Sequence, residues 1–393
     1  MKVLIFNSLY HPHVIGGAEN SVRILSEGLK EKGVESAVVS TADADKVEYV
    51  SGVKNYYVSS PNLYWMYRAK EQSGYKKPFW HLLDAYNPLI KKKIQNRIEG
   101  ESPDVIHTNN LAGFSVYVWR IAEQLSIPIV HTIRDYYLLC PKSSMFHKDR
   151  NCSSQCLICK CYSVPKKILS NNVEAVIGVS RFVLNMHLDR GYFEKAKEKT
   201  HIHNPIDGAT KTLGHSSDKD LRFGFVGLLS PDKGIEYLLT EFSEGRFKNT
   251  KLFVFGRGVT RTYEEYLVRK FKAENIFFMG YRKTEEIYPL INVLIVPSLW
   301  NEPFGRTIPE AYSYGIPVIT SDRGGMPEII DESRTGFVVC ADKRGDLEEK
   351  LRVFVDNPDL ISKFSRNCLE LSEKFDRNKI VDEYIRVYRK VQR

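Results

Sequence analysis

The sequence lacks any long hydrophobic run. Its longest apolar stretches, such as Val293–Pro297 continued by Leu299 and Trp300, fall far short of the ~18–20 residues that a membrane-spanning helix needs. The apolar start, Met1–Phe6, turns polar at Asn7 and is followed by no small-residue cleavage site, so we expect no signal peptide. These absences predict a soluble, cytoplasmic chain.

Extremes of composition are missing as well. Hydrophobic residues make up 42% and charged residues 27% of the 393 residues, which excludes disorder and fibrous repeats as descriptions of the whole chain. The 25 glycines and 17 prolines are ordinary numbers. The length leaves room for two or three domains of ~100–200 residues.

An excess of acidic residues is also lacking. The chain carries 57 lysines and arginines against 48 aspartates and glutamates, a formal net charge of +9. A basic excess favours acidic partners, namely nucleic acid, anionic lipid headgroups or phosphate-bearing substrates. Charge alone does not choose among them, but the sequence contains no nucleic-acid-binding motif, so we expect no nucleic acid partner.

Short apolar strands alternate with amphipathic helices in the first half of the chain. A strand predicted over Lys2–Ser8 precedes a helix whose apolar residues recur at helical spacing from Ala18 to Leu29. Further strands are predicted over Ser36–Ser40, Asp104–His107, Ile127–Ile133 and Ala175–Val179. This alternation predicts a parallel sheet covered by helices on both faces.

A second series of the same kind follows a break. Turn residues and then a polar, non-periodic segment at 211–220 predict a linker. Strands are then predicted over Leu221–Leu228, Lys251–Phe255, Val293–Pro297 and Pro317–Thr320, and helices over Gly234–Phe242, Tyr263–Lys272 and Ile308–Tyr314. The sequence therefore predicts an α/β protein of two open parallel-sheet domains facing a cleft, with ligands at the carboxyl ends of the strands.

A pair of glutamates carries the sharpest chemical signal. Glu302 follows a predicted strand and Glu310 lies in the first turn of the next helix, so both are expected at the carboxyl edge of the sheet. Two carboxylates there can accept hydrogen bonds from sugar hydroxyls. The backbone N–H groups of Gly305, Arg306 and Thr307 would face a phosphate. An alternative explanation of Glu310 is a helix capping box with Thr307, which leaves Glu302 unexplained.

A second candidate phosphate site is the pair Gly16 and Gly17, between a predicted strand and a predicted helix. Glycine lets the backbone approach an anion, and the start of the helix directs N–H groups toward it. The alternative is an ordinary turn.

Several motifs together resemble those of the retaining glycosyltransferases of family 4. Glu302 and Glu310 are separated by seven residues, and the segment between them begins with Glu-Pro-Phe-Gly at Glu302. This arrangement is similar to the paired glutamates of that family. The other matching segments are Gly16–Glu19, Asn204–Asp207, Phe225–Gly234, Gly315–Ile319 and Gly324–Glu328. The resemblance implies the GT-B fold of two Rossmann-like domains. Residues 1–205 would form an acceptor domain, joined by a C-terminal helix at about 376–393, and residues 206–375 a donor domain.

The resemblance also implies roles for individual residues. The donor would be a nucleotide sugar, a UDP- or GDP-sugar, bound mostly by the C-terminal domain with Glu310 on the ribose. Glu302 and the backbone of Phe304 and Gly305 would hold the donor sugar. Lys233 would bind the phosphates and stabilise the leaving diphosphate. Members of the family generally need no divalent metal, so no cofactor is expected for catalysis.

Two positions depart from the family pattern. Leu228 stands where the family usually has an arginine, five residues before Lys233, so one phosphate-binding cation is missing. Arg134 stands where the family usually has a histidine, at the end of a predicted strand. We predict that Arg134 is a catalytic residue that supplies the missing charge to the leaving diphosphate. Arg257 and Arg306 are the alternative sources.

Five of the seven cysteines lie close together in the sequence, which in a cytoplasmic chain indicates metal before disulfides. The spacing of Cys156 and Cys159 is that of one arm of a tetrahedral structural zinc site. Cys140 and Cys152 would complete the site. The substitutes for either are Cys161 and His147. The alternative is a loop with reduced, inert thiols.

Aromatic and basic residues are interleaved between Tyr64 and Arg97. Tyr64–Arg68 and Tyr75–Trp80 mix the two kinds, and Lys91–Lys93 follow. Such a surface suits an anionic membrane and a lipid-linked acceptor. The alternatives are RNA binding and a solvated face with partly buried aromatics.

Taken together, these features predict a cytoplasmic glycosyltransferase, peripheral on the membrane, that transfers sugar with retention to a growing glycan or a glycolipid during surface-polysaccharide assembly. Its acceptor hydroxyl would attack from the leaving-group face and give its proton to the departing phosphate. The alternative, suggested by Leu228 and Arg134, is a catalytically impaired sugar-nucleotide-binding or scaffold protein of a glycan assembly complex.

Overall fold

The computed structural model describes residues 1–59, 62–207 and 220–392. Contacts group the chain into two compact units: residues 1–145, 152–207 and 377–393 form the first, and residues 146–151 and 208–376 form the second. Most of the linker predicted at 211–220 lies outside the described residues. Each unit is an α/β structure built on a mainly or wholly parallel sheet, which confirms the predicted fold class.

The sheet of the first unit has the strand order β10-β9-β6-β5-β1-β2-β4-β3. Its strands are β1 (Lys2–Phe6), β2 (Glu35–Ala42), β3 (Lys46–Val50), β4 (Val53–Ser59), β5 (Val105–Thr108), β6 (Ile129–Ile133), β9 (Ala175–Gly178) and β10 (Glu198–His201). Neighbouring strands run parallel, except that β3 returns antiparallel along β4. Val3, Leu4, Ile5 and Phe6 of β1 are all buried, as expected for a strand covered on both faces.

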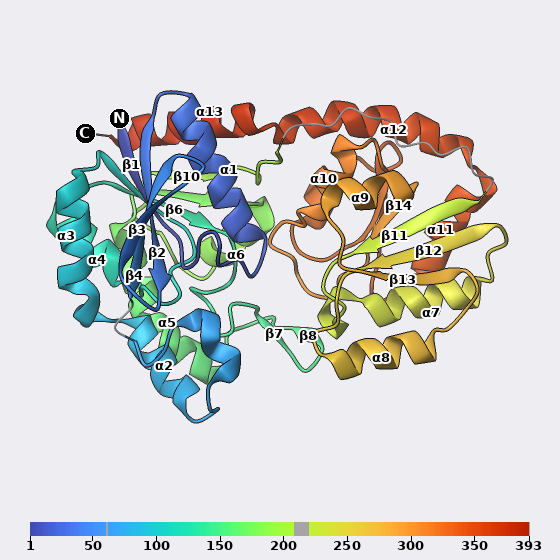
Figure 1. Ribbon diagram of the computed structural model, residues 1–393, viewed down its shortest axis with the longest axis horizontal. Helices are drawn as coiled ribbons and strands as arrows, with labels where there is room; N and C mark the ends of the chain where they lie inside the picture. The colour runs from blue at the N-terminus through green and yellow to red at the C-terminus, as the bar shows by residue number, and fades with distance from the viewer. Residues whose placement is uncertain (60–61, 208–219, 393) are drawn as a thin grey trace. The chain divides into compact units, whose positions relative to one another are not determined.

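Helices cover this sheet (Figure 1). The helices of the first unit are α1 (Gly17–Glu31), η1 (Met66–Glu71), α2 (Lys76–Ala85), η2 (Pro88–Ile90), α3 (Lys91–Glu101), α4 (Tyr117–Gln124), α5 (Leu157–Leu169), η3 (Ser170–Asn172), α6 (Arg181–Leu188) and α13 (Arg377–Val391). Here η marks a 3-10 helix. The sequence analysis predicted neither α5 nor the β3–β4 pair.

The C-terminal helix α13 completes the core of the first unit. It packs beside α1, as Figure 1 shows in red against blue. A Cβ on Gly28 would lie 2.6 Å from Val381 Cγ2, so this glycine sets how closely the two helices approach. Tyr384 and Tyr388 are fully buried, and the Tyr388 hydroxyl lies 2.8 Å from His107 Nδ1 of β5. This arrangement matches the returning C-terminal helix that the resemblance implied.

The second unit has a wholly parallel sheet with the strand order β13-β12-β11-β14-β15-β16. Its strands are β11 (Leu221–Val226), β12 (Thr250–Phe255), β13 (Ile276–Gly280), β14 (Val293–Val296), β15 (Val318–Ser321) and β16 (Gly336–Val339), and the hairpin β7 (Phe146–His147) and β8 (Arg150–Asn151) is grouped with them. Its core contains many phenylalanines, among them Phe223, Phe242, Phe337, Phe354 and Phe364.

The helices of the second unit lie between its strands and after them. They are η4 (Pro231–Lys233), α7 (Ile235–Gly245), α8 (Arg261–Lys270), α9 (Thr284–Ile287), η5 (Tyr288–Leu290), α10 (Thr307–Ser313), η6 (Met326–Glu328), α11 (Asp346–Asp356), α12 (Asp359–Ser372) and η7 (Glu373–Phe375). Across the described residues of both units, no helix combines the length and the apolar character needed to cross a membrane.

Candidate active site

Glu302 and Lys233 meet at the carboxyl edge of the second sheet. Glu302 lies in the connection from β14 to α10, and Lys233 ends η4, which follows β11. Lys233 Nζ donates to Glu302 Oε1, and the same ammonium lies 4.7 Å from the ring centroid of Trp300. Both side chains are partly exposed, so the pair is oriented and still open to a ligand. The structure therefore brings together two of the residues that the sequence singled out.

A close backbone approach fixes the position of Lys233. Gly234 has a φ of +71°, and a Cβ there would lie only 1.9 Å from the carbonyl oxygen of Pro297. Within η4, the carbonyl oxygen of Asp232 accepts from the N–H groups of Leu299 and Trp300, at 2.9 and 3.1 Å. Asp232 and Gly234, on either side of Lys233, thus hold the loop after β11 against the loop after β14.

Two further glycines support Glu302 from below. The N–H of Gly325 donates to the carbonyl oxygen of Glu302 at 2.8 Å. Gly324 has a φ of +66°, and a Cβ there would lie 2.1 Å from the same oxygen. The backbone of Glu302 therefore requires a glycine at position 324, while Gly325 contributes its backbone N–H.

The hairpin β7–β8 supports the same loop from another direction. Asn151 Nδ2 donates to the carbonyl oxygen of Leu299 at 2.7 Å, and Asn151 Oδ1 accepts from the N–H of Asn301 at 2.8 Å. Nothing in the sequence around Asn151 indicated this contact, because the partners are about 150 residues apart.

Glu310 lies on α10 with both carboxylate oxygens engaged. Oε1 accepts from Arg306 Nη2 at 3.0 Å and from Nε at 3.3 Å, while Oε2 accepts from the Tyr288 hydroxyl at 3.4 Å. Tyr288 stacks on Tyr314 at a centroid distance of 5.0 Å, and the negative charge of Glu310 joins burial in raising the pKa of Tyr288. Arg306 and Tyr288 therefore hold one face of a partly exposed carboxylate.

The capping explanation of Glu310 does not match the helix start. The N-cap of α10 is Arg306, which makes no side-chain capping hydrogen bond, and Thr307 is the first helical residue. The turn before it depends on Gly305, whose φ is +89° and where a Cβ would lie 2.8 Å from Met326 Cγ. Phe304 anchors that turn, because it is buried and contacts the ring of Phe375 at a centroid distance of 6.1 Å.

In the first unit, Gly16 and Gly17 form the exposed start of α1. Gly16 is the N-cap, and its N–H donates to Glu19 Oε2 at 3.0 Å. This hydrogen bond explains the buried Glu19, three positions after Gly16, as part of a helix cap.

Arg134 is placed directly after β6, as predicted, but its side chain is buried. Nε donates to Asn109 Oδ1 at 2.8 Å, Nη1 donates to Asn204 Oδ1, and Nη2 donates to the Tyr384 hydroxyl at 3.5 Å. These partners belong to the first unit. At least three of the five N–H donors of the guanidinium are therefore engaged within the first unit.

Three buried titratable residues that contact Tyr137 were not anticipated. Burial raises the pKa of the Asp135 carboxyl to about 6, although Tyr137 N–H donates to it at 2.8 Å, and Glu19 acts in the same direction as burial. Burial likewise raises the pKa of Asp84 to about 6. Burial lowers the pKa of Lys166 to about 8, although the negative charges of Asp84 and Asp135 act to raise it. A carboxyl with a pKa this close to neutrality can exchange a proton at physiological pH.

The alternative cations for the second unit lie near its ligand edge with partners of their own. Arg306 is paired with Glu310, and the Arg257 guanidinium lies 5.8 Å from the ring centroid of Tyr281. Leu228 is 48% exposed, so the position at which the family usually carries an arginine faces outward here.

The clustered cysteines are free thiols. Cys156 is the N-cap of α5, where the N–H and the thiol of Cys159 bond to it and lower its pKa. Burial raises the pKa of Cys159 to about 12, and nearby Cys140 and Cys156 add to the shift. In the part of the chain that the structure describes, no group of three or more His, Cys, Asp or Glu side chains is arranged to hold a metal ion. The zinc site stays a prediction.

Comparison with known proteins settles the family. A model described as Glycosyltransferase Family 4 matches residues 15–209, and one described as Glycosyl transferases group 1 matches residues 213–370. A Klebsiella pneumoniae protein named "Uncharacterized 42.6 kDa protein in cps region" is 33% identical over 332 residues, which cover 84% of this chain and 87% of that protein. The chain belongs to glycosyltransferase family 4. It is a glycosyltransferase, as predicted.

Other known proteins extend the likeness over the whole chain. The uncharacterized glycosyltransferase MJ1178 of Methanocaldococcus jannaschii is 28% identical and covers 99% of this chain and 98% of its own. Among solved structures, sucrose-phosphate synthase from Thermosynechococcus elongatus gives a TM-score of 0.76 at 20% identity and covers 99% of this chain and 98% of its own. Anabaena HepE in complex with UDP gives a TM-score of 0.74 at 18% identity, and the match covers 99% of this chain and 100% of HepE. These structures confirm the GT-B fold.

Proposed function

We propose that this glycosyltransferase moves a sugar, with retention of anomeric configuration, from a UDP- or GDP-sugar to a growing glycan or lipid-linked acceptor. The setting would be surface-polysaccharide or glycolipid assembly at the cytoplasmic face of a membrane. The observation that carries the proposal is the donor-side pairing in one unit, Lys233 with Glu302 and Arg306 with Glu310. The relative encoded in a cps region and the UDP held by HepE support the setting and the donor class.

Glu310 is proposed to bind the ribose. A carboxylate accepts hydrogen bonds from two vicinal hydroxyls, and such charge-assisted bonds are stronger than neutral ones. Arg306 and Tyr288 occupy part of the carboxylate and restrict its rotation, so less conformational entropy is lost when the nucleotide binds.

Lys233 and Glu302 are proposed to bind different parts of the donor, so their ion pair weakens when the donor binds. A diphosphate offers Lys233 a second anionic partner, and the carboxylate of Glu302 then accepts hydrogen bonds from hydroxyls of the donor sugar. Their mutual ion pair keeps both groups oriented before binding, with Trp300 beneath the ammonium. Fixed positive charge at the leaving oxygen stabilises the transition state because charge develops there as the bond breaks.

The proposed reaction breaks the bond between the anomeric carbon and the phosphate oxygen and forms a bond from that carbon to the acceptor oxygen on the same face. The acceptor proton passes to the departing phosphate. The electron pair of the broken bond stays on the diphosphate, beside Lys233. Arg134 remains a proposed additional cation, and its present hydrogen bonds to Asn109 and Asn204 make a change of partners part of that proposal.

The proposal is tested in two steps. A thermal-shift screen of UDP-, GDP- and ADP-sugars identifies the donor, since a ligand that binds the native state raises the melting temperature. Transfer is then measured as acceptor-dependent release of the nucleoside diphosphate, and the anomeric configuration of the product is read by NMR. If the protein binds a nucleotide sugar but releases no nucleoside diphosphate with any glycan or lipid-linked acceptor, the scaffold alternative is favoured. Inversion at the anomeric carbon would refute retention.

A further inference from the structure

The outer surface of helix α5 in the first unit is apolar although it faces away from the core. Its buried residues include the polar Ser163 and Lys166. Its exposed apolar residues are Leu157, Ile158, Val164 and Ile168. A surface helix of a globular protein normally turns its apolar stripe toward the core. The orientation of α5 is therefore reversed with respect to its sequence.

Internal contacts fix this reversed orientation. Lys166 Nζ donates to the carbonyl oxygen of Tyr137 at 2.8 Å and lies 3.4 Å from the centroid of the Tyr137 ring. Ser163 Oγ accepts from Gln155 Nε2 at 3.1 Å. Rotating α5 to bury its exposed apolar side chains would expose or unpair these buried polar groups, which is costly. The exposed apolar stripe is thus a built feature of the fold.

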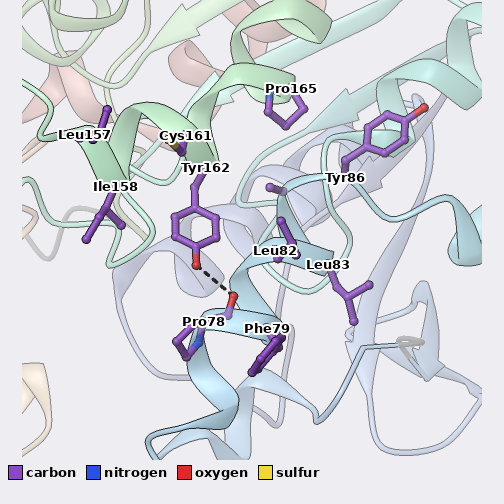
Figure 2. A pocket seen from close by; sticks show the side chains of 11 residues that line it. Pro78, Phe79, Leu82, Leu83, Tyr86, Leu157, Ile158, Cys161, Tyr162 and Pro165 are labelled. Atoms are coloured by element: carbon purple, nitrogen blue, oxygen red, sulfur yellow. Dashed lines mark hydrogen bonds between the residues drawn. The ribbon is translucent and has the colours of Figure 1, made fainter.

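Helix α2 continues the apolar surface. Phe79 and Leu82 are each 63% exposed, and the Tyr162 hydroxyl of α5 donates to the carbonyl oxygen of Pro78 at 3.1 Å. Figure 2 shows the resulting groove of about 740 Å³, with Phe79 and Leu82 on one side and Leu157 and Ile158 on the other. Its lining side chains are hydrocarbon apart from two tyrosine hydroxyls and one thiol.

Lysines stand next to groove residues in the sequence of both helices. Lys77 precedes Pro78 in α2 and Lys160 precedes Cys161 in α5, and both lysines are exposed. Lys91 and Lys92 line a second depression with exposed Leu89. The sequence of α5 contains no acidic residue, and the one carboxylate of α2, Asp84, is buried and accepts from the N–H of Gly113 at 2.6 Å. The exposed charged side chains of α2 and α5 are therefore all lysines.

We propose that this α2–α5 face docks the protein on an anionic lipid bilayer. The apolar side chains on the two sides of the groove, Phe79, Leu82, Leu157 and Ile158, enter the headgroup–acyl boundary. The lysines contact the anionic headgroups. Exposed Tyr75 and Tyr86 have the amphipathic character that suits the interface. A second copy of this chain would oppose like charges and is disfavoured. The proposal rests on the proposed function, because such a surface is where a lipid-linked acceptor is presented.

The test is co-sedimentation of the full chain with vesicles of phosphatidylcholine, with and without phosphatidylglycerol, at low and high salt. The wild type is expected to sediment with the anionic vesicles at low salt and to be released by salt. Leu157→Ser/Ile158→Ser should lower the partition coefficient roughly tenfold or more, since both side chains are exposed and their substitution leaves the core intact. Lys77→Glu/Lys160→Glu should abolish the preference for phosphatidylglycerol.

The matched control is Tyr49→Ser, on strand β3 of the same unit, because Tyr49 is 70% exposed and lies outside the groove. It should bind as the wild type does. Absence of wild-type binding at low salt, or unchanged binding of Leu157→Ser/Ile158→Ser, would overturn the proposal. So would a wild-type dimer in solution that this variant converts to monomer, since the face would then be an interface between two copies.

Failure of docking is distinguishable from failure of the proposed function. Nucleotide binding, and transfer to an acceptor presented in detergent, are measured on the same preparations. Loss of vesicle binding with intact transfer would overturn the docking proposal alone, and vesicle binding without transfer would overturn the proposed function alone.

Discussion

Replacing Glu310 by glutamine separates the ribose role from a structural role. The substitution removes a negative charge but keeps the shape of the side chain. A hydrogen bond to a charged group contributes ~1.5–3 kcal/mol, so loss of the ribose contact should weaken nucleoside diphosphate binding roughly ten- to 150-fold. The effect is measured by isothermal titration with the bare nucleoside diphosphate of the donor that the thermal-shift screen identifies.

The structural cost of the same substitution is expected to be small. The ion pair lost with Arg306 is partly exposed and joins the N-cap of α10 to a residue one turn later, and i,i+4 pairs of this kind contribute ~0.3–0.5 kcal/mol. Tyr288 keeps its hydrogen bond to the carbonyl oxygen of Thr307 at 3.1 Å. The free energy of unfolding in urea should therefore fall by less than ~1 kcal/mol. Equal nucleotide affinity of wild type and Glu310→Gln would refute the ribose role.

The remaining predictions concern turnover, backbone geometry and metal content. Glu302→Gln should lower kcat more than nucleotide affinity, because its proposed partner is the transferring sugar; a loss confined to nucleotide affinity would contradict that role. Arg134→Ala should lower kcat, with partial recovery in Leu228→Arg/Arg134→Ala; unchanged turnover of the single variant would exclude Arg134 from the reaction. Gly234→Ala should destabilise the protein by ~1–3 kcal/mol, measured in urea, because its left-handed backbone approaches a carbonyl oxygen; an unchanged midpoint would show that the loop relaxes. Elemental analysis should find about one zinc per chain; metal-free protein whose clustered thiols all titrate would discard the zinc site.

The sequence located the donor-side glutamates because they depend on topology. In a parallel sheet the residues that follow each strand gather at one edge, and this rule placed Glu302 and Glu310 there. Lys233 was indicated by the resemblance to the family. The ion pair of Lys233 with Glu302, and the ring of Trp300 beside it, depend on side-chain packing and were not foreseen.

The sequence failed where long-range partners decide the outcome. The position of Arg134 at a strand end was correct, but its burial depends on Asn204 and Tyr384, which are 70 and 250 residues away. Tyr288 reaches Glu310 from another segment, and no spacing rule links them. Helix α5 was missed although Leu157, Ile158, Val164 and Ile168 recur at helical spacing. Its outward-facing apolar side depends on contacts of Ser163 and Lys166 with other segments.

The return of α13 to the first unit affects how the protein is made on the ribosome. Domains generally fold as units during synthesis, the N-terminal one first. Here the first unit includes residues 377–393, so its fully buried Tyr384 and Tyr388 become available only after the whole second unit has been translated. The second unit, encoded in between, can therefore finish folding before the first. A stop codon before Tyr384 would leave the earliest-synthesised half of the chain without part of its core.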